Sequence, residues 1–265
     1  MCGIVGYIGR EQAAEIILSG LEKLEYRGYD SAGMAIYDGQ KINITKAVGR
    51  LKALDEITHG GESMPGMVGI GHTRWATHGV PNHVNSHPHF NQEETIAIVH
   101  NGIIENYIPL REKLLKRGYT FVSDTDTEVI VHLLDYYYKG NPLEAITKVL
   151  HRVEGSYAFG ILFADKPDEI FAVRKGSPLI VGKHETGSFI ASDVPAILKY
   201  TRSVYFVDEQ EVACLKEDSI RFFTVDEEEI QKECVHIDWD ENAAEKGGYE
   251  HFMLKEMYEQ PKTVM

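Results

Sequence analysis

The spacing of apolar residues along the chain alternates between a period of two and a period of about 3.6 residues. Residues 2–8 form a short apolar run bounded by glycine, which indicates a buried strand. In residues 11–26 the apolar positions fall on one face of a helix. A period of two then returns in runs that predict strands, the first two joined by a turn at Asp38-Gly39: 31–39, 41–49, 67–73 and 95–102.

The middle of the chain is predicted to be helical. One helix is expected over about 106–117, with Asn106 as a possible cap. A second opens with Thr125 and Glu128, which fit a capping box, and a third opens with Asn141-Pro142.

From residue 156 the period is mostly two, and successive runs predict a meander of antiparallel strands. Strands, then helices, then strands again indicate an α+β fold, in which two antiparallel sheets pack face to face between helical layers. Beyond about residue 238 the sequence becomes charged and poorly periodic. We therefore predict one domain over 1–240, followed by a linker over 241–265.

Composition narrows the class of protein. The chain has 265 residues, of which 43% are hydrophobic, and its formal net charge is -14. A surface this acidic argues against nucleic acid and anionic membranes as partners. The three cysteines are too few and too scattered for a disulfide framework, so a reducing, cytoplasmic location is expected. The sequence contains no apolar run long enough to suggest a membrane span or a signal peptide.

Cys2 stands directly behind the initiator methionine. If Met1 is removed, which a small second residue generally permits, Cys2 carries both a thiol and a free α-amine. An α-amine has a pKa of about 7.7–8.0, so it can act as a general base for the thiol near neutral pH. Such a residue suits acyl transfer. The alternative is that Cys2 simply begins a buried strand.

Acyl transfer also requires hydrogen-bond donors for an oxyanion. Asn101 and Gly102 follow a predicted strand, and the Asn101 amide and the Gly102 backbone N–H could both point at one oxygen. The alternative is a plain turn, because Asn-Gly is a strong turn dipeptide.

Further candidates lie in the segment GHTRWATHG, residues 71–79. Arg74 can bind a carboxylate through two hydrogen bonds, Thr77 and His78 add donors, and Trp75 could close a pocket. The alternatives are a surface ion pair for Arg74 and a packed ring for Trp75. Asp126 lies near a predicted helix start, where it could cap the helix or pair with a substrate ammonium.

A rival interpretation uses a cluster of histidines to bind zinc in a metal-dependent hydrolase. The residues concerned are His72, His78, His83, His87, His89 and His100. The only close pair is His87 and His89, and the helical spacing of zinc proteases is absent. We therefore expect no metal and no cofactor.

Taken together, these motifs occur in the order found in a known family. The chain closely resembles the amino-terminal glutaminase domains of glutamine–fructose-6-phosphate aminotransferases, among the N-terminal-nucleophile glutamine amidotransferases. The motifs YRGYDSAG and HTRWATHG distinguish this family from its relatives. Amidophosphoribosyltransferases typically show RGQESAG in place of the first motif, and asparagine synthetases show RGPD. The resemblance rests on CGIVGYIG, LEYRGYDSAG (24–33), GHTRWATHG (71–79), NSHPH (85–89), HNGIIEN (100–106) and SDTDTEV (123–129).

The resemblance implies a role for each candidate residue. Cys2 would be the nucleophile, with its own amine as base, and Asn101 and Gly102 would form the oxyanion hole. The implied substrate-binding residues are Arg74, Thr77 and His78 for the glutamine α-carboxylate, Asp126 for the α-ammonium, and Trp75 in a loop that closes over glutamine. Arg27 and Gly28 would form part of the wall around the nucleophile, with His87 as a supporting residue.

The resemblance also implies the αββα fold of the N-terminal-nucleophile hydrolases, L-glutamine as substrate, and glutamate and ammonia as products. In a complete enzyme of this family, a carboxy-terminal isomerase domain uses the ammonia to convert fructose 6-phosphate to glucosamine 6-phosphate. The sequence ends before such a domain, so we expect this chain to carry only the glutaminase half. A non-catalytic glutamine-binding module is a further alternative.

Overall fold

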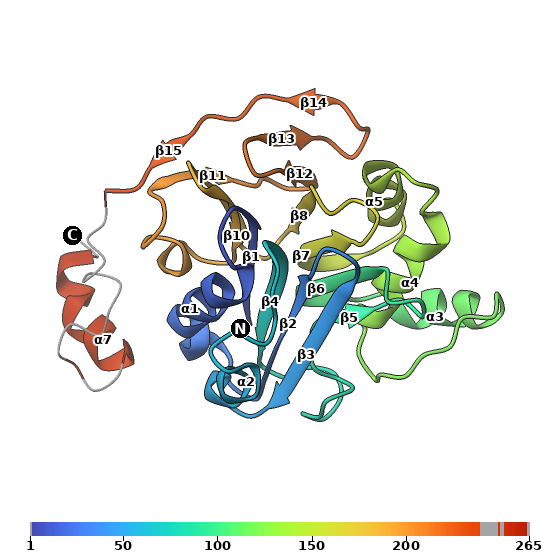
Figure 1. Cartoon of the computed structure of the whole chain (residues 1–265), viewed down its shortest axis with the longest axis horizontal. Coiled ribbons are helices and arrows are strands. Elements are labelled where there is room, and N and C mark those ends of the chain that lie inside the picture. The colour runs from blue at the N-terminus through green and yellow to red at the C-terminus, as the bar shows by residue number, and fades with distance from the viewer. Residues whose placement is uncertain (1, 239–248, 250–251, 264–265) are drawn as a thin grey trace.

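The computed structural model describes residues 2–238, 249 and 252–263 of the chain. Two antiparallel β-sheets lie face to face, and helices cover the outer face of each (Figure 1). This is the predicted layered α+β architecture. Met1 and most of residues 239–251 lie outside the described residues, and the predicted domain boundary at 240 remains a prediction. Within the expected linker, Phe252–Thr263 forms helix α7.

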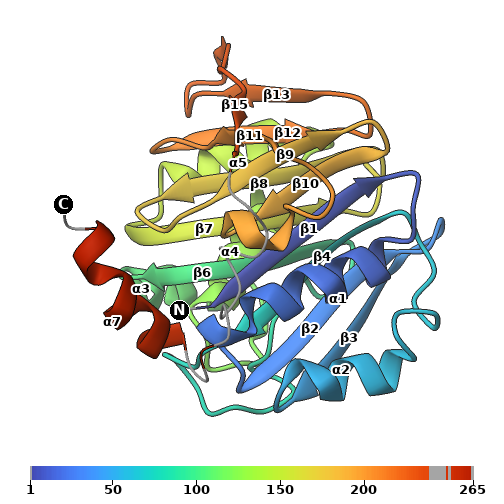
Figure 2. The same cartoon turned by 90° about the vertical axis from the view of Figure 1, so that its left-hand side faces the viewer.

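The first sheet has the strand order β15-β11-β9-β10-β1-β4-β2-β3 within the described residues. Its members are β1 (Gly3–Gly9), β2 (Ser31–Tyr37), β3 (Ile42–Val48), β4 (Val68–Arg74), β9 (Ile180–His184), β10 (Gly187–Ala191), β11 (Ser203–Phe206) and β15 (Val235–His236). Helices α1 (Ala13–Leu24) and α2 (Leu51–Thr58) cover its outer face (Figure 2). Short 3-10 turns span Glu25–Arg27 and Val194–Ala196.

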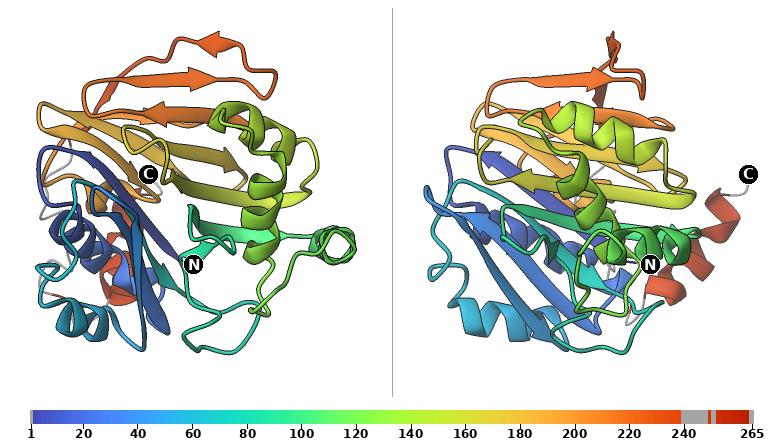
Figure 3. Two further views of the ribbon diagram at one scale, coloured as in Figure 1. Left: turned by 45° about the vertical axis from the view of Figure 1, so that its right-hand side comes forward. Right: turned by 90° about the vertical axis from the view of Figure 1, so that its right-hand side faces the viewer.

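The second sheet has the order β14-β13-β12-β8-β7-β6-β5 in the same part of the chain. Its members are β5 (His89–Phe90), β6 (Ile96–Ile104), β7 (Gly155–Phe163), β8 (Ile170–Lys175), β12 (Glu211–Leu215), β13 (Ile220–Phe223) and β14 (Glu229–Ile230). Its outer face carries α3 (Tyr107–Leu115), α4 (Thr127–Tyr137) and α5 (Pro142–Leu150), the green helices of Figure 3.

Three apolar layers hold these elements together. One lies between α1, α2 and the first sheet, one between the two sheets, and one between the second sheet and its helices. The close contact of α1 with β4 depends on glycine: a Cβ added at Gly71 would lie 2.3 Å from Cγ2 of Ile17. Because successive side chains of a strand point to opposite faces, each strand between two layers contributes to both.

The structure corrects two predictions about the order of strands and helices. The strands after residue 156 are antiparallel but do not form one meander, because β9, β10 and β11 join the first sheet while β7, β8, β12 and β13 join the second. Helix α2 was not predicted. Its sequence LKALDEIT is short, and only two apolar positions of the helix, Leu51 and Leu54, are buried, together with Thr58.

Two of the predicted helix caps are also wrong. Thr125 does not cap α4, because its hydroxyl contacts Ser123 and His89, and the Glu128 carboxylate instead accepts hydrogen bonds from Val122 and Ser123. The side chain of Asn106 makes no cap bond to α3. The third cap is confirmed, since the Asn141 side chain accepts a hydrogen bond from the backbone of Glu144.

No helix in the described part of the chain has the length and apolar character needed to cross a lipid bilayer.

Candidate active site

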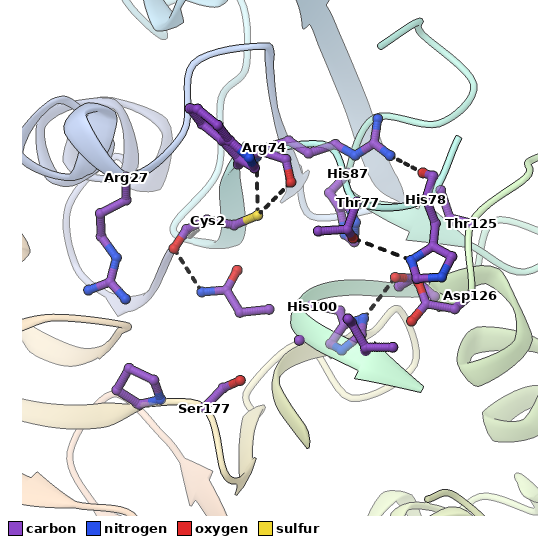
Figure 4. Close-up of a pocket in the computed structure, with 16 residues that line it drawn as sticks. Cys2, Arg27, Arg74, Thr77, His78, His87, His100, Thr125, Asp126 and Ser177 are labelled. Carbon is purple, nitrogen blue, oxygen red and sulfur yellow. Dashed lines mark hydrogen bonds between the residues drawn. The ribbon is translucent and has the colours of Figure 1, made fainter. Parts of the chain in front are cut away.

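A cavity of about 260 Å³ opens where the two sheets meet, at the carboxyl end of β4 and beside the amino end of β1 (Figure 4). Every predicted site residue except Gly28 lines it. The lining comprises Cys2, Arg27, Arg74, Trp75, Thr77, His78, His87, His100, Asn101, Gly102, Ile103, Thr125, Asp126, Thr127, Ser177 and Pro178. Residues from distant parts of the sequence therefore converge on one small space.

The period of two explains why the central residues face one another. On β4, Val68 and Ile70 belong to the apolar layer between the sheets, so His72 and Arg74 continue the same row. On β6, Ala97 and Val99 belong to that layer. Asn101 continues their row from the opposite sheet. Cys2 likewise precedes the inward-facing Ile4 of β1. The site is the polar end of the inter-sheet core.

The Cys2 thiol is held against the first residues of the loop after β4. The backbone N–H of Trp75 donates to Sγ at 3.1 Å, and the Sγ to Trp75 carbonyl oxygen distance is 3.5 Å. Burial raises the pKa of the Cys2 thiol, and the hydrogen bond from Trp75 works against that rise. The sulfur therefore needs a base to become a good nucleophile near neutral pH.

Asn101 is oriented by contacts on both sides of its amide. Its Nδ2 donates to the carbonyl oxygen of Cys2 at 3.0 Å, and its Oδ1 lies 3.0 Å from Nε2 of His72. Asn101 is 6% exposed. An amide nitrogen carries two hydrogens, so one remains for a substrate oxygen beside the cysteine.

Gly102 does not belong to a turn, and the turn alternative for Asn101-Gly102 is wrong. Both residues lie within β6, which continues to Ile104. Gly102 has a φ of 127°, and a Cβ at this position would lie 2.0 Å from the carbonyl oxygen of Ser156. Only glycine fits there.

Arg74 is buried, with only part of its guanidinium paired. Nη2 donates to the carbonyl oxygens of His78 and Gly79, whereas Nη1 is buried and has no partner among the described residues. Burial lowers the pKa of Arg74. Arg74 lines the cavity, and a buried cation with an unused donor is suited to binding an anion there. The surface ion pair considered for Arg74 is wrong.

Asp126 lies at the amino end of α4 but does not cap that helix. Its Oδ2 accepts a hydrogen bond from the backbone N–H of Ile104 at 2.7 Å, and the residue is 4% exposed. The carboxylate is thereby fixed on the β6 side of the cavity, where it can accept hydrogen bonds from a cation.

Trp75 and its neighbours form the outer rim. The Trp75 ring is half exposed and packs edge-to-face on Tyr29, with ring centroids 5.6 Å apart. Thr77 is exposed and His78 is partly buried, with its Nδ1 3.3 Å from the Thr77 hydroxyl.

Arg27 lines the cavity, and Gly28, the next residue, lies against the backbone of Arg74 and Trp75. Nη1 of Arg27 forms a 2.9 Å ion pair with Asp193. Gly28 does not line the cavity, but a Cβ there would lie 2.7 Å from the backbone carbon of Arg74. Gly28 therefore permits the two segments to touch.

Four of the clustered histidines are buried side by side. His72 stacks on His87 with ring centroids 4.2 Å apart, and His89 packs edge-to-face on His87. Burial lowers the pKa of His72 to about 3 and lowers those of His87, His89 and His100. Within residues 2–238 and the described part of α7, no group of three or more His, Cys, Asp or Glu side chains has a geometry suited to a metal ion.

Several residues that line the cavity were not predicted from the sequence. His100 had been considered only as a metal ligand, yet it lines the cavity with Nδ1 2.8 Å from the Thr127 hydroxyl. Thr125 and Thr127 flank Asp126, so sequence adjacency offered a signal for them. Ser177 and Pro178 come from the loop after β8 in the second sheet, and nothing in the local sequence pointed to them.

The chain is similar to known proteins along its whole length. Residues 72–199 match the family described as glutamine amidotransferase domain. Glutamine–fructose-6-phosphate aminotransferases (isomerizing) from Caldanaerobacter subterraneus subsp. tengcongensis and Clostridium acetobutylicum are 59% and 57% identical to the chain over 264 residues. The relative of that name from Thermococcus kodakarensis is 51% identical over 267 residues. These alignments cover 100% of the chain but only 43% or 44% of each relative.

Solved structures share the fold. The glutamine phosphoribosylpyrophosphate amidotransferase from B. subtilis, complexed with ADP and GMP, superposes with a TM-score of 0.74 at 27% identity. That superposition covers 84% of this chain and 49% of the other. A glutamine aminotransferase class-II domain protein from Silicibacter pomeroyi superposes with a TM-score of 0.60 at 15% identity, and it supports the fold alone.

Proposed function

Because the chain belongs to the glutamine amidotransferase family and is homologous to the amino-terminal part of glutamine–fructose-6-phosphate aminotransferases, we propose that it hydrolyses the side-chain amide of L-glutamine through Cys2. One observation carries the proposal. The same cavity holds a partly buried thiol, the amide of Asn101, a buried arginine with an unused donor and a buried carboxylate.

In this mechanism the Cys2 thiolate attacks the glutamine amide carbon. Removal of Met1 frees the α-amine of Cys2, which takes the thiol proton and passes it to the leaving nitrogen. Ammonia departs and leaves a γ-glutamyl thioester, and water then releases glutamate. The amine is needed as a base because burial raises the pKa of the thiol.

The developing oxyanion is bound by the second hydrogen of Asn101 Nδ2 and by the backbone N–H of Gly102. The α-carboxylate of glutamine pairs with Arg74, near Thr77 and His78, and the α-ammonium pairs with Asp126. Arg74 and Asp126 carry opposite charges and line the same cavity, which supports the binding of an amino acid in its zwitterionic form. Trp75 covers the bound substrate from the rim.

The longer relatives suggest the fate of the ammonia. The chain spans 43% of the length of the relatives named above from Caldanaerobacter and Clostridium, whose names describe an isomerizing aminotransferase. We propose that in a full-length protein the ammonia passes to a carboxy-terminal isomerase domain and converts fructose 6-phosphate to glucosamine 6-phosphate.

The test combines intact mass with an ammonia-release assay on the same sample. A sample lacking Met1 should release ammonia from glutamine, and Cys2→Ala should abolish release while still binding glutamine. Addition of a metal chelator should leave the rate of ammonia release unchanged. Activity that survives Cys2→Ala but is lost with chelator would favour a metal-dependent hydrolase. Glutamine binding without turnover in the trimmed protein would favour a binding module.

A further inference from the structure

His72 is fully buried on β4 and does not line the cavity, yet it contacts the amide of Asn101 directly. Its Nε2 lies 3.0 Å from Oδ1 of Asn101 and 3.0 Å from the carbonyl oxygen of His100. Both neighbours are oxygen atoms that can only accept hydrogen bonds. Nε2 must therefore carry the ring proton and donate to both.

The other ring nitrogen of His72, Nδ1, makes no such hydrogen bond within the described part of the chain. Nδ1 of His72 is buried and has no hydrogen-bond partner among the residues that the structure describes. The flat face of the ring stacks on His87, with an interplanar angle of 24°. Stacking holds the plane of the ring, and within that plane the Nε2–H bond points toward the two acceptors on β6. A buried polar atom without a partner costs stability, which argues that histidine is present for what Nε2 does.

We propose that His72 is a positioning residue that selects the orientation of the Asn101 amide and so directs its NH₂ group toward the reacting centre. If the amide rotated by half a turn, its nitrogen would face the Nε2–H of His72, and two donors would oppose each other. The oxygen would then face the carbonyl oxygen of Cys2, where two acceptors would meet. His72 thus excludes the orientation that could not bind an oxyanion. This inference rests on the proposed function of Asn101.

The electrostatic state of His72 suits this role. Burial lowers the pKa of His72 to about 3, so the ring is uncharged throughout the physiological range. An uncharged ring has a single N–H, and the two β6 oxygens place that hydrogen on Nε2. His72 neither gains nor loses a proton during the reaction, which distinguishes it from a general acid or base.

The first test compares two amide side chains at position 72. In His72→Gln the side-chain nitrogen can reach the place of Nε2, whereas in His72→Asn the side chain is too short to reach Asn101. We expect His72→Gln to keep glutaminase kcat within about threefold of the parent. His72→Asn should lower kcat about 10- to 100-fold, less than the roughly 100- to 1,000-fold cost of losing an oxyanion donor outright. KM should change little in either variant, because the glutamine carboxylate and ammonium contacts are untouched.

The second test is a double-mutant cycle with Asn101→Ala. If His72 acts through Asn101, then His72→Asn should lower kcat in the parent but add nothing in the Asn101→Ala background. A merely structural role would lower kcat equally in both backgrounds. His132→Asn is a matched control. His132 is a histidine of α4 that is also buried, at 1% exposed, and its ring packs on Tyr119. This control variant should leave kcat within a factor of about two.

The outcomes separate this inference from the proposed function. If Asn101→Ala itself keeps full glutaminase activity, the oxyanion role of Asn101 is wrong. If Asn101→Ala is impaired but His72→Asn is fully active, or the two losses multiply, only the role of His72 is refuted. Iodoacetamide should alkylate Cys2 at the same rate in His72→Asn as in the parent. A folding defect in this variant would instead change the alkylation rate and lower the midpoint of unfolding.

Discussion

Mild acid should destabilise this protein through its buried histidines. His72, His87 and His89 are at most 6% exposed. Burial lowers the pKa of His72 to about 3 and lowers those of His87 and His89 well below 6.5. In the unfolded chain each imidazole returns to a pKa of about 6.5. The unfolded state therefore binds more protons, and stability is full above pH 6.5 and declines as the pH falls toward the folded-state values.

The size of the effect follows from linkage. A histidine that stays neutral in the folded protein and titrates at about pH 6.5 when unfolded costs about 1.3 kcal/mol between pH 7 and pH 5.5. Three such residues cost about 4 kcal/mol, a large part of the roughly 5–15 kcal/mol by which folded proteins are stable. His100, whose pKa burial also lowers, acts in the same direction. The window stops at pH 5.5 because carboxylates dominate the loss of stability at lower pH.

The measurement is urea-induced unfolding followed by circular dichroism at pH 7, 6.5, 6 and 5.5 and constant ionic strength. The free energy of unfolding should fall by about 4 kcal/mol across this range. In His72→Phe the fall should be about 1.3 kcal/mol smaller, whatever the variant's stability at pH 7. His83→Gln is the control, because His83 is exposed and its ring meets water in both states. A fall of less than about 1.3 kcal/mol in the parent would refute the idea that burial keeps these rings uncharged.

Two further predictions concern the substrate site. Arg74→Ala should raise the KM for glutamine by about 10- to 100-fold, the equivalent of a hydrogen bond to a charged group. Its kcat should stay close to the parent value, because in the proposed binding mode Arg74 contacts a part of glutamine that does not react. Steady-state kinetics that show mainly a loss of kcat would contradict the role proposed for Arg74. Gly102→Ala should lower both kcat and stability, because the new Cβ would lie 2.0 Å from the Ser156 oxygen at a φ of 127°. Thermal unfolding and ammonia release measure the two effects, and a variant with parental values of both would show that the backbone at Gly102 is not constrained.

The sequence was informative wherever a local pattern has a local cause. Alternation identified β2, β3 and β4 almost to the residue, and the Asn141-Pro142 start of α5 is confirmed. The strands after residue 156 divide between the two sheets according to the neighbours with which each one pairs. The spacing of apolar residues within a strand does not determine that pairing. The capping box at Thr125 failed for a similar reason. The Glu128 carboxylate has better partners in the preceding loop, and the Thr125 hydroxyl bonds His89 from a distant segment.

The candidate site was predicted in part from residue chemistry and mostly through family resemblance. The position of Cys2 and the charges of Arg74 and Asp126 made these residues candidates, each with a structural alternative, and only the resemblance favoured the functional role. His100 and Ser177 line the same cavity but carried no separate signal. Their contribution depends on how β6 and the loop after β8 meet in space.

The row on β4 shows how the fold balances stability against the proposed chemistry. Val68 and Ile70 are apolar, and extending the row with a leucine at position 72 would bury more apolar surface and remove a group that titrates in acid. It would also leave Oδ1 of Asn101 and the carbonyl oxygen of His100 without the donor that they share. Stability alone therefore favours an apolar residue at 72, whereas orientation of the Asn101 amide requires a rigid donor at that point. Histidine supplies this donor at the expense of stability, as expected where an apolar core ends in a candidate active site.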